Sequence, residues 1–267
     1  MDLELEGKTA IVTGGSRGIG KAIAKELALS GCDVVICARN AEDLDLTARE
    51  LSIETGRRVI GITADTTNSE DVNRMVKQAA EALGSIDILV NNAAAPGGLA
   101  GGPLATISDD DVLEDLNTKV VGYLRCARAV GSYMTSQGWG RIVNIGGLSA
   151  RASSGNNLSA GVRNSGLVNL TKYLADQLGG AGVTVNLVHP GATRTERSGP
   201  AYEERARQQG ITVKEVEARV AANNSTKRIV DASELAYVVA FLASPRSIAI
   251  SGEVIAAGGG SGQAVFH

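Results

Sequence analysis

The stretch that decides the fold is Thr13-Gly14-Gly15-Ser16-Arg17-Gly18-Ile19-Gly20. It follows an apolar segment at 8–13 that is typical of a strand, and it opens a segment at 18–30 that is typical of a helix. Glycine permits the tight turn, and the start of a helix offers free N–H groups and the positive end of its dipole to an anion. Between a strand and a helix, this turn predicts a binding site for the phosphates of a dinucleotide. The alternative is a loop that needs glycine only for its backbone angles.

Strand-like and helical segments alternate along the rest of the chain. Further strands are predicted at 33–37, 58–63, 87–90, 141–145, 183–188 and 253–256, and further helices at 41–55, 69–83, 111–134, 158–178 and 233–242. Asn68 and Ser108 are expected to cap the helices that follow them. Seven strands alternating with helices predict a parallel sheet covered on both faces. We therefore expect an α/β fold with a single, doubly wound Rossmann-type domain over residues 1–267, with ligands outside the carboxyl ends of the strands.

Composition and charge argue against several classes of partner. The 267 residues carry a net charge of −3, and 3% of them are aromatic, which favours neither nucleic acid nor an anionic membrane as a partner. The start of the chain lacks the apolar core of a signal peptide, and no run of about 18 apolar residues occurs, so we expect a cytoplasmic protein. Cys32, Cys37 and Cys126 have no metal-type spacing, and free thiols are expected, with a disulfide as the alternative. No metal site is predicted.

The end of the second predicted strand indicates which dinucleotide is bound. An acidic residue there would bind a ribose 2′-hydroxyl and repel a 2′-phosphate. The sequence instead reads Cys37-Ala38-Arg39-Asn40, without an acid. Arg39 is a planar cation with several donors, which suits a phosphate, and Arg17 adds a second cation inside the glycine turn. Both arginines favour NADP(H), and two solvated surface arginines are the alternative.

Further motifs occur in the order found in one enzyme family. Asp65 follows the third predicted strand, Asn91-Asn92-Ala93-Ala94 the fourth, and Pro190-Gly191-Ala192-Thr193-Arg194-Thr195 the sixth, while Asn117 lies in the long helix and 250–255 leads into the last strand. With the glycine turn, these segments make the chain resemble the short-chain dehydrogenase/reductase family over residues 7–260.

The resemblance implies how the cofactor would be held. It places at NADP(H) the residues Gly14, Ser16, Arg17, Gly18, Ile19, Gly20, Arg39, Asp65, Asn91, Ala93, Pro190, Gly191, Thr193 and Thr195. Asp65 would contact the adenine, and Thr195 would hold the nicotinamide carboxamide. The resemblance also implies a substrate lid over 193–224, a small-molecule substrate, and a homotetramer or homodimer.

The chain departs from the family at its catalytic residues. The family ends its fifth strand with a catalytic serine, and a Tyr-x-x-x-Lys pair follows in the next helix. Segments 143–145 and 166–171 fix the alignment without a gap, and the three positions hold Gly147, Ala160 and Asn164. Alanine has no proton to give, and an asparagine amide carries no charge that could shift a neighbour's pKa. Loss of a positioned general acid costs ~10²–10⁴-fold in rate.

Other residues are candidates for the missing roles. Our predicted catalytic residues are Asn117, which matches the asparagine of the family's proton relay, Arg163, which could stabilise an oxyanion, and Asn164, which could bond a ribose hydroxyl. Arg163 could instead be a surface or interface charge. His189 is suited to proton transfer, with a buried structural role as the alternative. Serines crowd the loop before the helix, where they usually serve as turns and caps, at Ser149, Ser153, Ser154 and Ser159.

Two functions are compatible with these residues. The first is an NADP(H)-dependent oxidoreductase with an atypical active site, acting on a carbonyl/alcohol pair or an activated double bond, because hydride transfer depends mainly on the nicotinamide and its orientation. The second is a protein that binds NADP(H) without redox turnover and acts as a sensor, partner or scaffold. The intact phosphate turn is compatible with both, and the missing acid pair favours the second.

Overall fold

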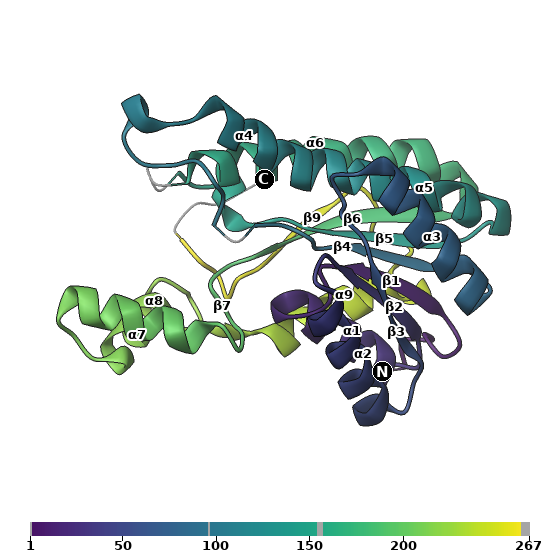
Figure 1. Cartoon of the computed structure of the whole chain (residues 1–267), viewed down its shortest axis with the longest axis horizontal. Helices are drawn as coiled ribbons and strands as arrows, with labels where there is room; N and C mark the ends of the chain where they lie inside the picture. Colours follow the sequence, from purple (N-terminus) through teal and green to yellow (C-terminus); the bar gives the residue numbers. More distant parts are fainter. Residues whose placement is uncertain (1, 96, 154–156, 263–267) are drawn as a thin grey trace.

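A parallel sheet forms the centre of the molecule (Figure 1). The computed structural model describes residues 2–95, 97–153 and 157–262, and within them the sheet has seven strands in the order β3-β2-β1-β4-β5-β6-β9. The strands are β1 (Thr9–Thr13), β2 (Asp33–Ala38), β3 (Val59–Thr63), β4 (Ile88–Asn91), β5 (Gly140–Ile145), β6 (Val183–Pro190) and β9 (Val254–Ala257). The strand order reverses between β1 and β4, so the predicted doubly wound α/β fold is confirmed.

Helices cover both faces of this sheet. One face is covered by α1 (Gly18–Leu29), α2 (Ala41–Thr55) and α9 (Ala232–Ala243), and the other by α3 (Ser69–Leu83), α5 (Gly122–Gln137) and α6 (Leu158–Leu178) (Figure 1). Successive side chains of a strand point to opposite faces, so Ile11 packs in the second core while Ala10 and Val12 pack in the first. This two-sided burial explains why the strands are apolar throughout rather than alternating.

The long helix expected over 111–134 is interrupted, which corrects that prediction. The structure has α4 (Asp109–Leu116), a π-helical turn at Asn117–Val121, and then α5. A π turn inserts one extra residue into the helix and rotates the side chains that follow, and such turns are frequent at functional sites. The expected caps are confirmed, because Ser108 accepts from the Asp111 N–H, and Asn68 accepts from two N–H groups at the start of α3.

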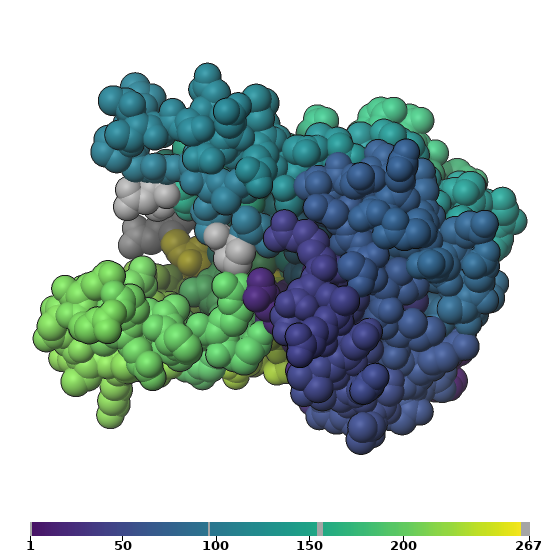
Figure 2. Space-filling model, viewed as in Figure 1, coloured from purple at the N-terminus to yellow at the C-terminus, as the bar shows by residue number. Residues whose placement is uncertain are grey.

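The segment predicted as a lid forms a separate pair of helices. It comprises β7 (Thr193–Arg194), α7 (Ser198–Gln209) and α8 (Val213–Ala222), and β7 pairs with β8 (Val230–Asp231). On the face seen in Figure 2, α7 and α8 form a lobe, and the surface is hollowed between it and the part of the molecule that carries α4. A role as substrate lid stays a prediction.

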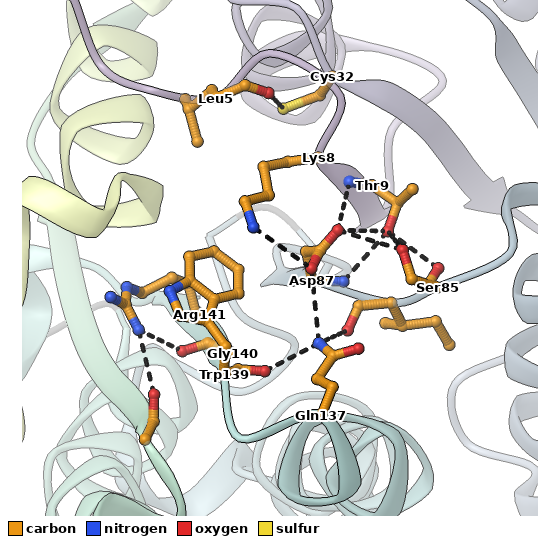
Figure 3. Close-up of polar contacts among 12 residues, drawn as sticks. Leu5, Lys8, Thr9, Cys32, Ser85, Asp87, Gln137, Trp139, Gly140 and Arg141 are labelled. Carbon is orange, nitrogen blue, oxygen red and sulfur yellow. Dashed lines mark hydrogen bonds and ion pairs between the residues drawn. The ribbon is translucent and has the colours of Figure 1, made fainter.

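A cluster of polar side chains and one tryptophan fixes the amino edge of the sheet (Figure 3). The Asp87 carboxylate accepts from the Thr9 N–H and hydroxyl, at 2.9 and 3.0 Å. The Lys8 ammonium and the Arg141 guanidinium lie 4.2 and 4.5 Å from the centroid of the Trp139 ring. These contacts join the beginnings of β1, β4 and β5, so the sheet is tied together at the edge opposite the expected site.

Candidate functional site

The glycine turn has the backbone geometry that an anion site needs. Gly14 and Gly18 have φ angles of +65° and +60°, which L side chains rarely adopt. A Cβ at Gly20 would lie 2.2 Å from the Gly14 carbonyl oxygen, so only glycine allows this approach. Helix α1 begins at Gly18, and Arg17 gives it no side-chain cap. Because no side chain at the N-cap position bonds the first N–H groups of α1, these groups can be reached by an anion.

The turn is supported by neighbouring elements. The Asn92 amide donates to the carbonyl oxygens of Thr13 and Gly14, both at 3.1 Å, and the Thr47 hydroxyl of α2 donates to the Ser16 carbonyl at 2.9 Å. The Ala93 N–H donates to the Thr13 hydroxyl at 3.1 Å. These bonds fix the end of β4 against the turn, so the two predicted cofactor segments lie together.

Asn91 lies differently from its neighbours. Its side chain is fully buried, and its amide donates to the Asn144 side chain of β5 at 3.0 Å. It therefore joins the two central strands below the surface of the site. Because the Asn91 side chain is occupied in this way, the predicted cofactor contact is now expected from its backbone, and it stays a prediction.

Arg17 and Arg39 follow the carboxyl ends of neighbouring strands. β1 and β2 pair in parallel with Thr13 opposite Cys37, and the Gly14 N–H donates to the Cys37 carbonyl at 2.8 Å. Both arginines are exposed, and within the described part of the chain no ion pair is formed by either. Two unneutralised cations beside a phosphate turn suit an additional phosphate group.

A carboxylate lies at the phosphate turn. The Gly18 N–H donates to Glu196 Oε1 at 2.7 Å, and a Cβ at Gly18 would lie 4.0 Å from the Thr195 methyl group. Glu196 lies between β7 and α7, so the start of the lid segment reaches the N-terminus of α1. The position of Glu196 indicates that this helix end attracts an anion.

The other predicted cofactor residues also lie at the carboxyl edge of the sheet. Asp65 follows β3, and its carboxylate accepts from the N–H and the hydroxyl of Thr67. Pro190 ends β6, and a Cβ at Gly191 would lie 2.9 Å from Gly258 Cα. Thr193 begins β7, and its hydroxyl donates to the Gly191 carbonyl at 3.2 Å. Their cofactor contacts stay predictions, as do those of Ser16 and Ile19 beside the turn.

The positions aligned with the family's catalytic residues meet in space. A Cβ at Gly147 would lie 2.7 Å from Asn164 Nδ2, and that amide donates to the Ser149 hydroxyl at 2.8 Å. Ala160 lies one turn earlier on the same face of α6 and is buried. Ser149 thus reaches the site through a short 3₁₀ turn, whereas Ser154 lies outside the described residues.

Arg163 is not a surface charge, so that alternative is wrong. It is 3% exposed, and its guanidinium is paired with the Asp115 carboxylate at 2.5 Å and donates to the Ala95 carbonyl at 2.7 Å. Asp115 also accepts from the Ser159 hydroxyl and from the Leu99 N–H. The ion pair therefore joins α4, α6 and the segment before Ala100 beside the site.

Lys119, rather than the predicted Asn117, directs its side chain to the end of β5. The Asn117 side chain accepts from Arg125 at 2.8 Å, and no bond to Gly147 or Asn164 is described for it. Lys119, which the sequence analysis missed, is 4% exposed, and its ammonium donates to the Gly146 carbonyl at 2.9 Å. Burial, aided by the nearby Arg163 charge, lowers the pKa of Lys119 to about 7. In the sequence, the only hint of this burial was that Lys119 is followed by the apolar residues Val120 and Val121.

His189 supports the end of β5. Its Nδ1 accepts from the Gly147 N–H at 2.9 Å, and a Cβ at Gly146 would lie 2.2 Å from that nitrogen. Burial, with the charges of Arg151 and Lys119, lowers the pKa of His189 to about 4. The imidazole is therefore neutral at pH 7, in agreement with the buried structural role and against its use as an imidazolium acid.

Comparison with known proteins decides the family. A family model described as enoyl-(acyl carrier protein) reductase matches residues 14–261. The chain is 32% identical over 259 residues to a putative ketoacyl reductase of Streptomyces coelicolor, covering 96% of this chain and 98% of that protein. The chain belongs to the short-chain dehydrogenase/reductase family. Within that family it is also 30% identical to the NADPH-dependent reductase BacG of Bacillus subtilis, covering 95% and 97% of the two chains.

Solved structures of the family have the same fold. L-Sorbose reductase of Gluconobacter frateurii, solved with NADPH and L-sorbose, superposes with a TM-score of 0.93 at 28% identity over 99% of this chain and 100% of that one. Within residues 2–95, 97–153 and 157–262 of the present chain, no group of three or more His, Cys, Asp or Glu residues is arranged so that it could hold a metal ion. No helix within the same residues is both long and apolar enough to cross a membrane. The cysteines of this chain at 32, 37 and 126 are free and buried, as expected.

Proposed function

We propose that the protein is an NADP(H)-dependent oxidoreductase that transfers a hydride between the nicotinamide and a carbonyl/alcohol pair or an activated double bond, in an atypical active site. The observation that carries this proposal is the anion site at the start of α1, with Arg17 and Arg39 beside it and no acid at the end of β2. NADP(H) supplies the hydride, so the protein must bind it, orient it and control the proton.

The relatives support carbonyl reduction as the first substrate class to test. Two of those compared above are named for ketone or ketose reduction, and the structure of one of them holds NADPH. The matched family model is described by the reduction of an enoyl double bond, which keeps the second substrate class open. Enone-like substrates need little help from an acid, so they suit a site with Ala160 at the tyrosine position.

One observation favours the alternative of NADP(H) binding without redox turnover. Gly147, Ala160 and Asn164 leave all three aligned catalytic positions without a titratable group. A protein of this kind would act as a sensor, partner or scaffold. Hydride transfer with any substrate decides against it.

We also propose a cytoplasmic homotetramer or homodimer. The outer faces of α5 and α6 expose apolar side chains at Tyr133, Val162, Val168 and Tyr173, which a second copy of the chain could cover. The free, buried cysteines suit a reducing compartment. Light scattering during gel filtration would give the mass, and a monomer at micromolar concentration would contradict this part of the proposal.

A calorimetric titration with NADPH and with NADH tests the cofactor site. We expect the wild type to bind NADPH more tightly, and Arg39→Ala to weaken NADPH binding by about tenfold or more, because a charge-assisted phosphate contact is lost. NADH binding should change little. The matched control is Arg58→Ala, since Arg58 lies at the start of β3, at the opposite edge of the sheet. Failure to bind either nucleotide would overturn the proposed function.

A further inference from the structure

Lys119 is a buried cation at the centre of the site. It lies in the π turn between α4 and α5, and its ammonium donates to the carbonyl oxygen of Gly146, which directly follows β5. The next residue, Gly147, occupies the position of the family's catalytic serine and lies against Asn164. The lysine side chain therefore ends beside the backbone segment at which the reacting oxygen of a substrate is expected.

Charged and titratable groups from several elements lie around Lys119. Arg163 comes from α6, Asp115 from α4 and His189 from β6, while Tyr123 of α5 lies beside Arg163 and bonds the residue before Gly146. Asp115 and Arg163 neutralise each other in a close pair, and His189 is neutral. Burial raises the pKa of Tyr123, whose hydroxyl donates to the Ile145 carbonyl at 3.0 Å. A further cation, Arg151, acts on His189 from the turn after β5. Lys119 itself has no carboxylate paired with it among the described residues, and an environment that disfavours its charged form lets it release a proton near neutral pH.

The bonding capacity around Lys119 is incomplete. An ammonium has three donors, and a single acceptor, the Gly146 carbonyl, is described for this one. Asn164 Oδ1 and His189 Nε2 are also buried without a hydrogen-bond partner within the described residues. Asn164 and His189 lie against Gly147 and Gly146. Buried polar atoms in native proteins are nearly always paired, so unpaired ones around these two glycines point to a small polar ligand. A substrate oxygen would provide the missing acceptor for Lys119.

The site contains a lysine and an asparagine, as the family resemblance predicts, but each lies on the element where the other is expected. The family resemblance predicts an asparagine on the helix after β4 and a lysine at position 164. The structure has Lys119 on the former element and Asn164 on the latter, and the asparagine at 117 points to Arg125. The lysine charge that position 164 lacks is therefore available from the π turn.

We propose that Lys119 exchanges the proton with the substrate oxygen, in place of the tyrosine and lysine that positions 160 and 164 lack; this rests on the proposed oxidoreductase function. In the reduction, the hydride of NADPH adds to the carbonyl carbon, and the π-bond electron pair moves to oxygen. That oxygen takes a proton from the Lys119 ammonium, so an N–H bond breaks and an O–H bond forms. The products are the alcohol, NADP⁺ and a neutral amine, which a proton from solvent restores.

The test compares Lys119→Met and Lys119→Arg with wild type. NADPH oxidation is followed from pH 5.5 to 9.5 with L-sorbose, ethyl acetoacetate and cyclohexenone as probes, and NADPH binding is measured by calorimetry. Carbonyl reduction by the wild type should fall as the pH rises through about 7, because the ammonium is the acid. Lys119→Met should lower the rate ~10²-fold or more and should abolish the fall in rate above pH 7, while its NADPH affinity stays unchanged. Lys119→Arg should also be slow and independent of pH, since a guanidinium does not release its proton. The matched control is Lys77→Met, an exposed lysine on α3.

The outcomes separate this inference from the proposed function. A wild type that binds NADPH but reduces none of the probes overturns the proposed function and, with it, the role of Lys119. A wild type that turns over while Lys119→Met keeps its rate or the fall in rate above pH 7 overturns the inference alone. An activity-independent measurement is an NMR titration of ¹⁵N-labelled lysine side chains, with Lys119→Arg for assignment. A Lys119 midpoint near the ordinary lysine value, about 10.4, overturns the inference whatever the activity.

Discussion

Gly147 and Asn164 are packed closely, so a larger residue at position 147 requires the Asn164 side chain to move. Gly147 has extended backbone that any residue can adopt, so its constraint is space rather than conformation. A Cβ there would lie 2.7 Å from the Asn164 amide nitrogen, well inside van der Waals contact. The glycine at 147 and the asparagine at 164 therefore suit each other sterically.

This fit predicts the effect of restoring the serine. Gly147→Ser should lower the free energy of unfolding by about 1–3 kcal/mol, because overpacking forces Asn164 to move. In an Asn164→Ala background the same substitution should cost much less, since the amide is gone. Urea unfolding of the two single variants and the double variant measures the coupling. Gly131→Ser on α5, where a Cβ meets nothing within 4 Å, is the control. Equal costs in both backgrounds would contradict the prediction.

Single residues of the site were predictable where a local pattern defines them. The glycines at 14, 18 and 20 and the absence of an acid after β2 depend only on neighbouring sequence. Lys119 and the buried Asp115–Arg163 pair could not be identified in this way, because their burial depends on packing between α4, α6 and the end of β5. A charge on an amphipathic helix is usually solvated, and the sequence does not show which neighbours enclose it.

The same limit applies to whole elements. Apolar periodicity runs without a break through 111–134, so the sequence predicts one continuous helix. The π turn at Asn117–Val121 changes the register by a single residue, which a pattern of apolar positions does not reveal. It changes which side chains after Asn117 face the end of β5, so identifying the helix was not sufficient to identify Lys119 as the side chain that reaches Gly146.

The contact between the lid segment and α1 predicts competition with the cofactor. The Glu196 carboxylate accepts from the Gly18 N–H at 2.7 Å, at the helix end where phosphates are expected to bind. Glu196→Gln should raise NADPH affinity roughly two- to fivefold, because an exposed charge at a helix terminus contributes about 0.3–1 kcal/mol. Calorimetry measures the change.

A neighbouring glutamate provides the control for this prediction. Glu203→Gln removes a negative charge from the exposed surface of α7, away from the helix end, and should leave NADPH affinity unchanged. An equal gain in both variants would indicate a general effect of net charge. An unchanged or lower affinity in Glu196→Gln would contradict competition at the turn.

For the whole molecule, the sequence predicts the fold because its information is repeated along the chain. Each strand is apolar on both faces and each helix has one apolar side, so several independent segments indicate the same layered sheet. The two edges of that sheet then differ in purpose. The amino edge is tied by Asp87 and by the cations around Trp139, whereas the carboxyl edge contains a buried lysine, Lys119. Tertiary packing determines this second feature.

That buried lysine makes the stability of the molecule depend on pH. The pKa of Lys119 is about 7 in the folded protein and about 10.4 when unfolded, so between these values the unfolded chain binds more protons. The free energy of unfolding therefore rises with pH across this window, by at most about 1.4 kcal/mol per pH unit. The cost of burying the lysine is fully present below pH 7 and disappears above the unfolded value.

Comparison with Lys119→Met isolates this contribution to stability. Methionine has no proton to release, so we expect the stability of wild type relative to the variant to increase from pH 7 to pH 10 in urea unfolding. The lowered pKa of His189, about 4, acts below this window. Burial raises the pKa values of Cys32 and Cys37 to about 12, which lowers stability above pH 9, but equally in both proteins. A difference that does not change with pH would mean that Lys119 keeps its proton in the fold, and it would remove the electrostatic basis for proton exchange in this site.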